Sequence, residues 1–250
     1  MGVRKIIPFL LVCLSLLSLP SIAKAGDIYV VSVGISNYKE IPDLGLPEND
    51  AKAIAELYKT KTKNVILITG RYATKAKIIK SIKDQFSRAK ENDMIVLSFS
   101  GHGYPGGICP YDMSSNPRSG ITYSEIRKIL KHSRAKRKII FADACFSGGI
   151  RGYNSNANSS SYKDSDVLLF LSSRTGEKSI ESQFMANGFF TTYLLRGLRG
   201  GADTDYNRKI TAKELFIFVS QGVKERSEDK QHPVMWGKFN DNYVLMDWSK

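Results

Sequence analysis

Two side chains in this sequence, Cys145 and His102, could act together as a nucleophile and its base. Cys145 follows an apolar run at 139–142 and precedes two glycines at 148–149. His102 lies between two glycines, shortly after a second apolar run. A thiol becomes a strong nucleophile when a neighbouring histidine takes its proton or pairs with the thiolate. N–H groups at Gly103 and Cys145 could hold an oxyanion. The two residues therefore predict nucleophilic thiol chemistry.

Each of the two residues also has an ordinary structural interpretation. A free cysteine is most often a small buried hydrophobe, and His102 alone could be a hydrogen-bonded loop residue. The combination favours chemistry, because each residue stands on a glycine-flanked loop directly after a buried strand. If those strands are neighbours in a parallel sheet, both loops lie at the same edge, where α/β proteins present reactive side chains.

The elements that would position these loops are strands alternating with helices. Short continuous apolar runs predict buried strands, and 3.6-residue periodicity predicts amphipathic helices between them. We expect strands at 27–35, 64–69, 93–99, 139–142 and 167–172, with late strands at 232–236 and 243–246 near a sheet edge. We expect helices from residue 47 and over 74–89, 122–131, 189–198 and 211–223. This alternation predicts an α/β fold with a mainly parallel sheet covered on both faces.

Several segments between these elements have a distinct composition. Thr122 and Glu125 have the spacing of a capping box, which marks a helix start. A Gly- and Pro-rich loop is expected after His102, and the stretch 151–165 is rich in Asn, Ser and Gly, which predicts a surface loop. Cys109 and Cys145 could form one disulfide by count, but we do not expect one, since it would silence Cys145.

The first 25 residues have the pattern of a secretory signal peptide. Basic Arg4 and Lys5 precede an apolar run at 6–19, and Ala23-Lys24-Ala25 offers a cleavage site. Cys13 is interpreted as part of the apolar run, since Val12 is larger than the usual residue before a lipoprotein cysteine. We therefore expect an exported chain, periplasmic or secreted, with one domain over 26–250. No second apolar span is present, so no stable membrane association is expected.

The 250 residues carry 37 Lys and Arg against 24 Asp and Glu, a formal net charge of +13 at pH 7. Such a balance can serve nucleic acids or an anionic surface. The lysines are spread over predicted helix faces, however, and no nucleic-acid recognition motif accompanies them. The sequence therefore favours a solvated basic surface and predicts no nucleic-acid partner.

The motifs around the two reactive residues resemble those of the caspase-like cysteine peptidases. Ser100-Gly101-His102-Gly103 is followed by Asp143-Ala144-Cys145-Phe146-Ser147-Gly148, and the caspase signature has its histidine about 50 residues upstream of the cysteine. Animal caspases have Gln where this chain has Asp143, so the resemblance is closer to bacterial and metacaspase-type members. Further matching stretches lie at 33–38, 48–51, 110–112 and 188–195.

This resemblance implies a caspase-hemoglobinase fold, a three-layer αβα sandwich with a central sheet of about six strands. It also implies a Cys145–His102 dyad that cleaves peptide bonds through an acyl-enzyme, with Gly103 at the oxyanion. A non-catalytic caspase-like domain that binds peptides or partners is the main alternative, and the intact dyad positions argue against it. A secreted protein that binds anionic surfaces through its positive charge is a further alternative.

In metacaspase-like members the pocket for the residue before the cleaved bond is acidic, and its positions correspond to Asp50, Asp143 and Ser100. Two carboxylates at one pocket oppose each other's ionisation and favour a cation between them. An Arg guanidinium or a Lys ammonium supplies that cation. We therefore predict peptide or protein substrates cleaved after Arg or Lys, not after Asp. Asp50 could instead be a helix N-terminal acid, and Asp143 a turn cap.

Two further predictions concern processing and calcium. Some relatives are cut in the loop after the cysteine, and Arg151 and Lys163 are basic sites in such a loop here. No cofactor is required by the predicted chemistry. Calcium is a candidate ligand because one set of residues has EF-hand spacing, namely Asp203, Asp205, Asn207 and Glu214. Arg208 stands where an EF-hand needs glycine, so a turn leading into a capped helix is the alternative.

Overall fold

The computed structural model of the protein describes residues 26–104, 106–144, 167–174, 177, 179–180, 186–237 and 243–249. Cys145, the basic sites Arg151 and Lys163, the predicted loop 151–165 and the predicted signal peptide 1–25 lie outside the described residues. In the described part of the chain, no helix has both the length and the apolar character needed to cross a bilayer.

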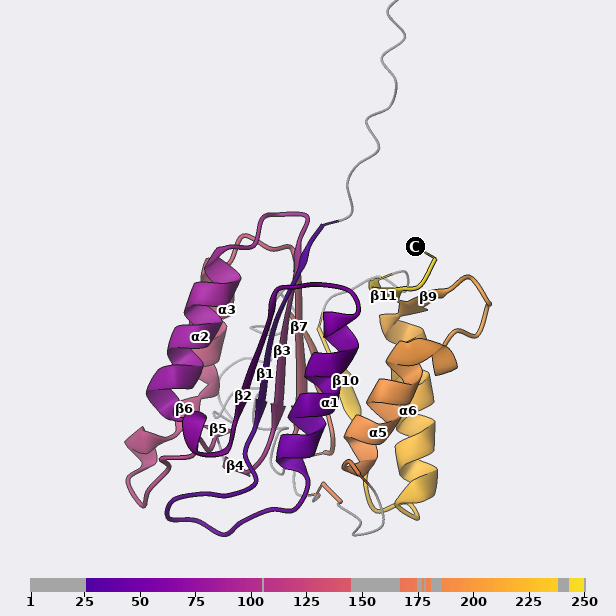
Figure 1. Ribbon diagram of the computed structural model, residues 1–250. Helices are drawn as coiled ribbons and strands as arrows, with labels where there is room; N and C mark the ends of the chain where they lie inside the picture. The colour runs from indigo at the N-terminus through magenta and orange to yellow at the C-terminus, as the bar shows by residue number, and fades with distance from the viewer. Residues whose placement is uncertain are drawn as a thin grey trace, which may run out of the picture.

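The centre of the fold is a six-stranded sheet with strand order β10-β8-β7-β3-β1-β2 (Figure 1). Its strands are β1 (Ile28–Gly34), β2 (Val65–Thr69), β3 (Met94–Ser100), β7 (Arg137–Asp143), β8 (Val167–Leu171) and β10 (Val234–Trp236). All neighbours pair in parallel except β10, which runs antiparallel to β8 at one edge. The predicted mainly parallel sheet of about six strands is confirmed.

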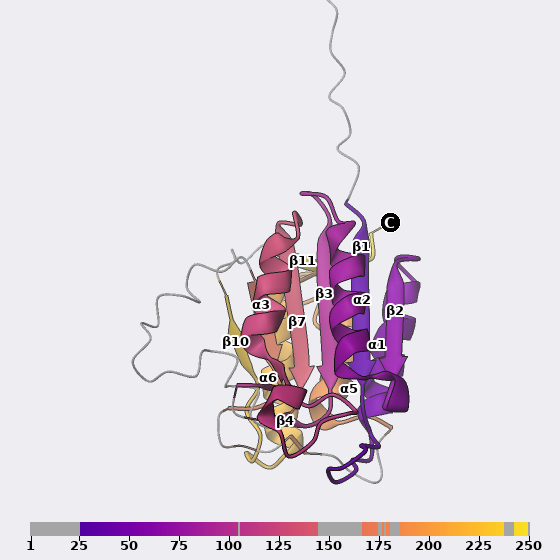
Figure 2. The same cartoon turned by 90° about the vertical axis from the view of Figure 1, so that its left-hand side faces the viewer.

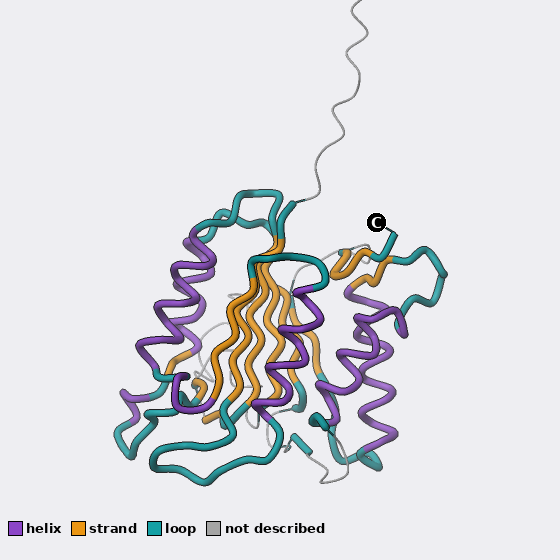
Figure 3. The backbone as a smooth tube through the Cα atoms, in the orientation of Figure 1, coloured by secondary structure: helices purple, strands orange, loops and turns teal. Residues whose placement is uncertain are grey.

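Helices cover both faces of this sheet (Figures 1 and 3). One layer holds α1 (Pro47–Lys59), α5 (Phe189–Arg196) with its continuation η4 (Gly197–Gly201), and α6 (Ala212–Arg226). The other layer holds α2 (Lys75–Ser87) and α3 (Tyr123–His132), which lie side by side in Figure 2. The chain therefore forms the predicted three-layer αβα sandwich.

Alternating side chains of the buried strands build two separate cores. In β7, Ile140 and Ala142 belong to the core under α2 and α3, whereas Ile139 and Phe141 belong to the core under α1, α5 and α6. A strand buried on both faces must be apolar at nearly every position, which is why the run at 139–142 predicted it. The residues that follow the five parallel strands therefore lie at one common edge of the sheet.

Local signals fix several helix starts. Thr122 and Glu125 form the predicted capping box of α3, with reciprocal hydrogen bonds between side chains and backbone N–H groups. Thr211 and Glu214 form a second capping box at the start of α6, and the Thr74 side chain accepts a hydrogen bond from Lys77 N at the start of α2. These caps satisfy backbone donors that a helix leaves unpaired.

Short elements depart from the sequence-based expectations. The predicted loop after His102 contains β4 (Gly103–Tyr104), β5 (Gly107–Ile108) and β6 (Ile121–Thr122), which form a small antiparallel sheet. The strand expected at 243–246 near the edge of the main sheet is β11 (Val244–Asp247), which instead pairs with β9 (Lys209–Thr211). β4, β5, β6 and β9 have two or three residues each, too few to show a period, so sequence pattern could not reveal these four strands. Two short 3₁₀ helices, η1 (Gly70–Tyr72) and η2 (Pro117–Ser119), complete the described elements.

Candidate active site

The loop that carries His102 begins at the carboxyl end of β3, beside the carboxyl end of β7. Ser100 and Asp143, the last residues of the two strands, are direct register partners, and Gly101 N donates to the Asp143 carbonyl at 3.1 Å. The two strands are therefore neighbours, as the sequence argument required. Cys145 is outside the described residues, but it is covalently the next residue after Ala144, which follows β7 at this edge.

His102 is held by two hydrogen bonds, one to its backbone and one to its ring. Its backbone N–H donates to the Tyr38 hydroxyl at 2.8 Å, and the Tyr38 and His102 rings lie 5.1 Å apart. Its Nε2 lies 2.9 Å from the carbonyl oxygen of Pro42. A carbonyl can only accept, so Nε2 carries the proton, and in the neutral ring Nδ1 is left as the acceptor. His102 thus offers Nδ1 as a base, oriented by Pro42.

Glycine at position 101 makes this arrangement possible. Gly101 has φ +154°, and a Cβ built there would lie 2.6 Å from the Tyr38 hydroxyl oxygen and 3.0 Å from Cζ of Phe99. Burial raises the pKa of Tyr38 far above its usual range, so its hydroxyl stays protonated while it accepts from His102. Any larger residue at 101 would push this tyrosine away from the histidine backbone.

Asp50 lies in the first turn of α1, where Pro47 and an acidic residue favour a helix start. Its side chain is almost fully buried, at 2% exposure. One carboxylate oxygen, Oδ2, accepts from Ser100 Oγ at 2.8 Å. The other, Oδ1, accepts from Asn187 Nδ2 at 2.9 Å and from Gly188 N at 3.1 Å. Asp50 forms no ion pair with any described residue.

Asp143 approaches the same point from the end of β7. Its Oδ2 accepts from Thr191 Oγ1 at 2.8 Å and from Thr191 N at 3.3 Å, in the first turn of α5. A Cβ built at Gly188 would lie 3.0 Å from Asp143 Oδ2 and 3.5 Å from Asp50 Oδ2. The two carboxylates therefore converge on the space in front of Gly188.

Burial shapes the electrostatics of this pair. Loss of hydration, and then the charge of Asp143, raise the pKa of Asp50 to about 8, although hydrogen bonds from Asn187, Ser100 and Gly188 act in the opposite direction. Two buried carboxylates near each other cannot both ionise without cost. A cation placed between them would offset that cost and return Asp50 to its ionised form.

These side chains enclose one cavity of about 210 Å³ at the carboxyl edge of the sheet. The predicted residues Asp50, Ser100, His102 and Asp143 all line it, and so does Ala144. The remaining described lining residues are Leu44, Pro47, Gly101, Ser179 and Gly188, and none of them is a lysine or an arginine. The cavity thus brings the His102 imidazole together with two buried carboxylates.

A family model for the caspase domain matches residues 29–244 of this sequence. The chain belongs to the caspase domain family. The resemblance inferred from the sequence motifs is thereby confirmed, and the family is one of cysteine peptidases. A peptide or protein is accordingly the expected class of substrate.

The fold of this caspase domain also matches a solved structure. The crystal structure of protein GSU0716 from Geobacter sulfurreducens aligns with a TM-score of 0.65 at 17% sequence identity, over 89% of this chain and 98% of that chain. At this identity the match supports the fold alone. No curated protein sequence matches this chain.

Several residues that support the lining of this caspase domain's cavity were not singled out by sequence reasoning. Tyr38, Asn187 and Thr191 hold His102, Asp50 and Asp143 respectively through hydrogen bonds. Tyr38 and Thr191 lie within stretches that match the family, at 33–38 and 188–195, which was the available signal. Pro42 acts through its backbone carbonyl, and a carbonyl acceptor leaves no mark in a sequence.

The candidate calcium residues form a separate cluster in the loop before α6. Ligand atoms of Asp203, Asp205 and Glu214 lie within 4.8 Å of one another, and Arg208 takes φ +64° at the position where an EF-hand needs glycine. The carboxylates already accept hydrogen bonds within the loop, for example Glu214 Oε2 from Thr211 N at 2.9 Å. The loop thus has the turn and the helix cap of the alternative interpretation, and calcium binding there stays a prediction.

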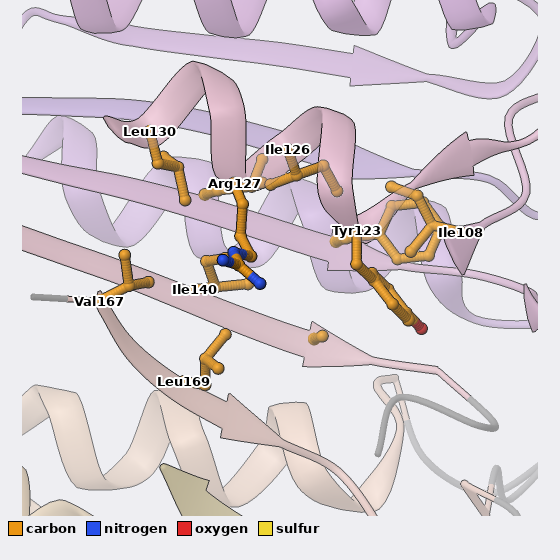
Figure 4. Close-up of a pocket in the computed structure, with 11 residues that line it drawn as sticks. Ile108, Tyr123, Ile126, Arg127, Leu130, Ile140, Val167 and Leu169 are labelled. Carbon is orange, nitrogen blue, oxygen red and sulfur yellow. The ribbon is translucent and has the colours of Figure 1, made fainter. Parts of the chain in front are cut away.

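The other cysteine and a second cavity do not contribute to this site. Cys109 is a buried free thiol, and burial raises its pKa to about 11. An apolar cavity of about 30 Å³ lies between α3 and the sheet, with Tyr123 and Arg127 among its lining residues (Figure 4). It has room for little more than a water molecule. The cavity around Asp50 and Asp143 is therefore the candidate active site.

Proposed function

We propose that this caspase domain is a cysteine endopeptidase that cleaves peptide bonds after Arg or Lys through a Cys145–His102 dyad. One observation carries the proposal, namely that two buried carboxylates and the His102 ring share one cavity. The caspase family membership supplies the peptidase chemistry. The acidic cavity supports the basic specificity.

The cavity suits a basic side chain for a simple electrostatic reason. Asp50 and Asp143 converge in front of Gly188, where the absence of a Cβ leaves space. An Arg guanidinium presents a planar fork of N–H donors to two carboxylates, and a Lys ammonium presents a point charge. An Asp side chain there would add a further carboxylate to a desolvated site that already holds two.

The proposed first step is attack by the Cys145 thiolate on the scissile carbonyl carbon. His102 Nδ1 takes the thiol proton, a carbon–sulfur bond forms, and the carbonyl oxygen becomes an oxyanion. Gly103, directly after the base, and the Cys145 backbone are proposed to supply N–H donors to that oxyanion. The imidazolium then gives its proton to the leaving amine as the peptide C–N bond breaks.

The proposed second step releases the acyl group. His102 Nδ1 takes a proton from water, the hydroxide attacks the thioester carbonyl, and the carbon–sulfur bond breaks to free the thiolate. Pro42 keeps the ring in position in both steps by accepting from Nε2. This chemistry uses residues of the chain alone, so we expect full activity in the presence of EDTA, with no requirement for calcium.

Two further properties belong to the same proposal. The enzyme would cleave its own chain after Arg151 or Lys163, because both are basic sites of the required kind. Intact mass spectrometry on incubated protein would show fragments ending at these residues, and fragments from the Cys145→Ala variant as well would contradict self-cleavage. Export to the periplasm or the medium follows from residues 1–25 and is tested by N-terminal sequencing of the mature protein.

The central test is hydrolysis of fluorogenic peptides that differ only in the residue before the cleaved bond. We expect turnover with Arg and Lys, and none with Asp or with citrulline, the neutral isostere of Arg. The Cys145→Ala and His102→Ala variants should lose this turnover, whereas Glu56→Gln, an exposed acid on the same helix as Asp50, should retain it.

Two outcomes would count against the proposal in different ways. Binding of Arg peptides without cleavage, together with a Cys145 thiol that resists alkylation, would favour a peptide-binding domain. Cleavage after Asp or citrulline at the rate seen for Arg would retain the peptidase and remove the specificity.

A further inference from the structure

The two helical layers of this protein differ in net charge. α2 carries four lysines against one aspartate, and α3 carries one arginine and two lysines against one glutamate. On the opposite layer, the helices α1, α5 with η4, and α6 together carry seven lysines and arginines against five acidic residues, a net charge of +2 compared with +5 for α2 and α3. Because α2 and α3 lie side by side (Figure 2), lysines that are spread along the sequence gather on a single face.

Each of the two acidic residues on α2 and α3 already pairs with one lysine, so neither neutralises the other basic residues of this face. Lys80 forms an ion pair with Asp84 on α2, and Lys75 pairs with Glu125 of α3 at 3.2 Å. Lys83 and Lys128 are exposed and form no ion pair with any described residue. The face therefore presents a surplus of unpaired cations.

A groove of about 430 Å³ runs between the two helices. The half-buried Ile79 and Ile129 give it an apolar floor. Lys83, Lys128 and His132 stand at its exposed rim. Glu125, the one acidic residue among its described lining residues, is paired with Lys75. The floor is concave, so it can receive an apolar side chain, while the rim meets negative charge. Helix-in-groove recognition uses this combination, in which an amphipathic segment lays apolar anchors into a cleft.

We propose that this α2–α3 groove docks an acidic amphipathic segment of a partner protein. The cationic rim would attract carboxylates of the segment, and the apolar floor would bind its apolar side chains. The groove lies over one face of the sheet, whereas the proposed catalytic residues lie at the carboxyl edge. The proposal is therefore independent of the proposed peptidase activity.

Two other anionic partners fit the face less well. Insertion into a membrane uses protruding apolar side chains, and none of the exposed large apolar residues in the described part of the chain belongs to α2 or α3. Single-stranded nucleic acid binds by stacking on exposed aromatic rings, but Phe86 and Tyr123, the aromatic residues of these helices, are buried. An acidic amphipathic peptide uses both the rim and the floor.

The test is fluorescence anisotropy with a labelled 18-residue peptide that has leucines at i, i+3, i+4 and i+7 spacing and glutamates elsewhere. The host is the Cys145→Ala protein, which removes any proteolysis. We expect saturable binding that weakens at least tenfold in the Lys83→Glu/Lys128→Glu variant. The matched variant Lys52→Glu/Lys63→Glu, with the same charge change on α1 and the residues after it, should bind within twofold of the parent.

A scrambled peptide of the same composition separates docking from general polyanion binding. We expect it to bind at least fivefold more weakly, since its leucines no longer form one face. Absence of binding up to 200 µM, equal binding of the scrambled peptide, or equal weakening in both charge-reversal variants would each overturn the proposal. So would tighter, equally variant-sensitive binding of a DNA oligonucleotide or of vesicles with 30% anionic lipid.

Discussion

The carboxylate cavity and the α2–α3 groove are both concave and charged, but they differ in sign and in burial. Asp50 and Asp143 are buried, held by hydrogen bonds from Ser100, Asn187 and Thr191. Lys83 and Lys128 are exposed at the rim of the groove. Water and salt screen the exposed charges, whereas the buried pair interacts in a poorer dielectric.

This difference in burial changes what each region can recognise. In the cavity, the unfavourable ionisation of two close carboxylates is relieved by one cation of the right size, which gives a narrow specificity. In the groove, several hydrated cations attract negative charge over a wide area, and only the apolar floor adds selectivity. The cavity therefore suits a single side chain, and the groove suits a whole segment.

The largest expected effect comes from neutralising the cavity. Asp50→Asn or Asp143→Asn should each lower kcat/KM for the Arg peptide at least about 100-fold, since losing one partner of a desolvated charge pair costs about 2–5 kcal/mol. The Glu56→Gln variant on the same helix should change it less than about twofold. Steady-state kinetics with the Arg and citrulline peptides measures both effects.

A companion variant separates charge from space. In Gly188→Ala the new Cβ would lie 3.0 Å from Asp143 Oδ2 and 3.5 Å from Asp50 Oδ2. It would therefore occupy the space in which we propose that the basic side chain of the substrate binds. Gly188 has φ −56°, which alanine adopts without strain. A folded Gly188→Ala protein that hydrolyses Arg peptides normally would show that the cation does not bind between these carboxylates.

The two regions also differ in how far the sequence could predict them. Asp50, Ser100, His102 and Asp143 each lie at or next to the end of an element with a clear pattern, and the family motifs include all four. The groove has no such signal, because Lys83 and Lys128 lie on helices far apart in the sequence. Their adjacency depends on how two helices pack on a sheet, which a single sequence does not state.

The same distinction explains the smaller misses in the fold. Thr122 and Glu125 form a local capping box, so the start of α3 was predictable from four residues. Val244–Asp247 was expected as a strand, but its partner β9 (Lys209–Thr211) is too short to have a period of its own, and the two pair because they meet in space. A capping box can be predicted from neighbouring residues, whereas strands that form through long-range pairing can be predicted only where they are long and apolar enough to show a pattern.

Salt should have a smaller effect, which we expect to be larger on peptide binding to the groove than on hydrolysis at the cavity. Raising NaCl from 50 to 300 mM should weaken binding of the acidic peptide to the groove at least about tenfold, because exposed charges are screened within a Debye length of about 10 Å or less. Hydrolysis of the Arg peptide should change less than about threefold, since the buried pair is screened much less. Equal salt dependence of binding and hydrolysis would contradict the inference that the cavity charges are shielded from salt by burial.

The smallest effect concerns stability and pH. The pKa of Asp50 is raised to about 8 in the folded protein, whereas an unfolded Asp titrates near about 3.9. Between these values the native state binds more protons than the unfolded state, so the free energy of unfolding should fall as pH rises from about 4 to 8. Asp50→Asn removes this titration, and the amide can still accept from Gly188 and donate to Ser100 Oγ.

Thermal unfolding in the Cys145→Ala background should therefore show Asp50→Asn to be more stable than its parent at pH 8.5, by at least about 1 kcal/mol and at least a few degrees in Tm. At pH 5 the parent carries a neutral Asp50, and the two proteins should differ little. The same substitution would thus stabilise the fold while removing Arg cleavage, as expected where a site keeps an unfavourable buried charge for its ligand. Parallel stability curves from pH 5 to 8.5 would instead mean that Asp50 is ionised throughout and that the cavity holds its charge at no cost to folding.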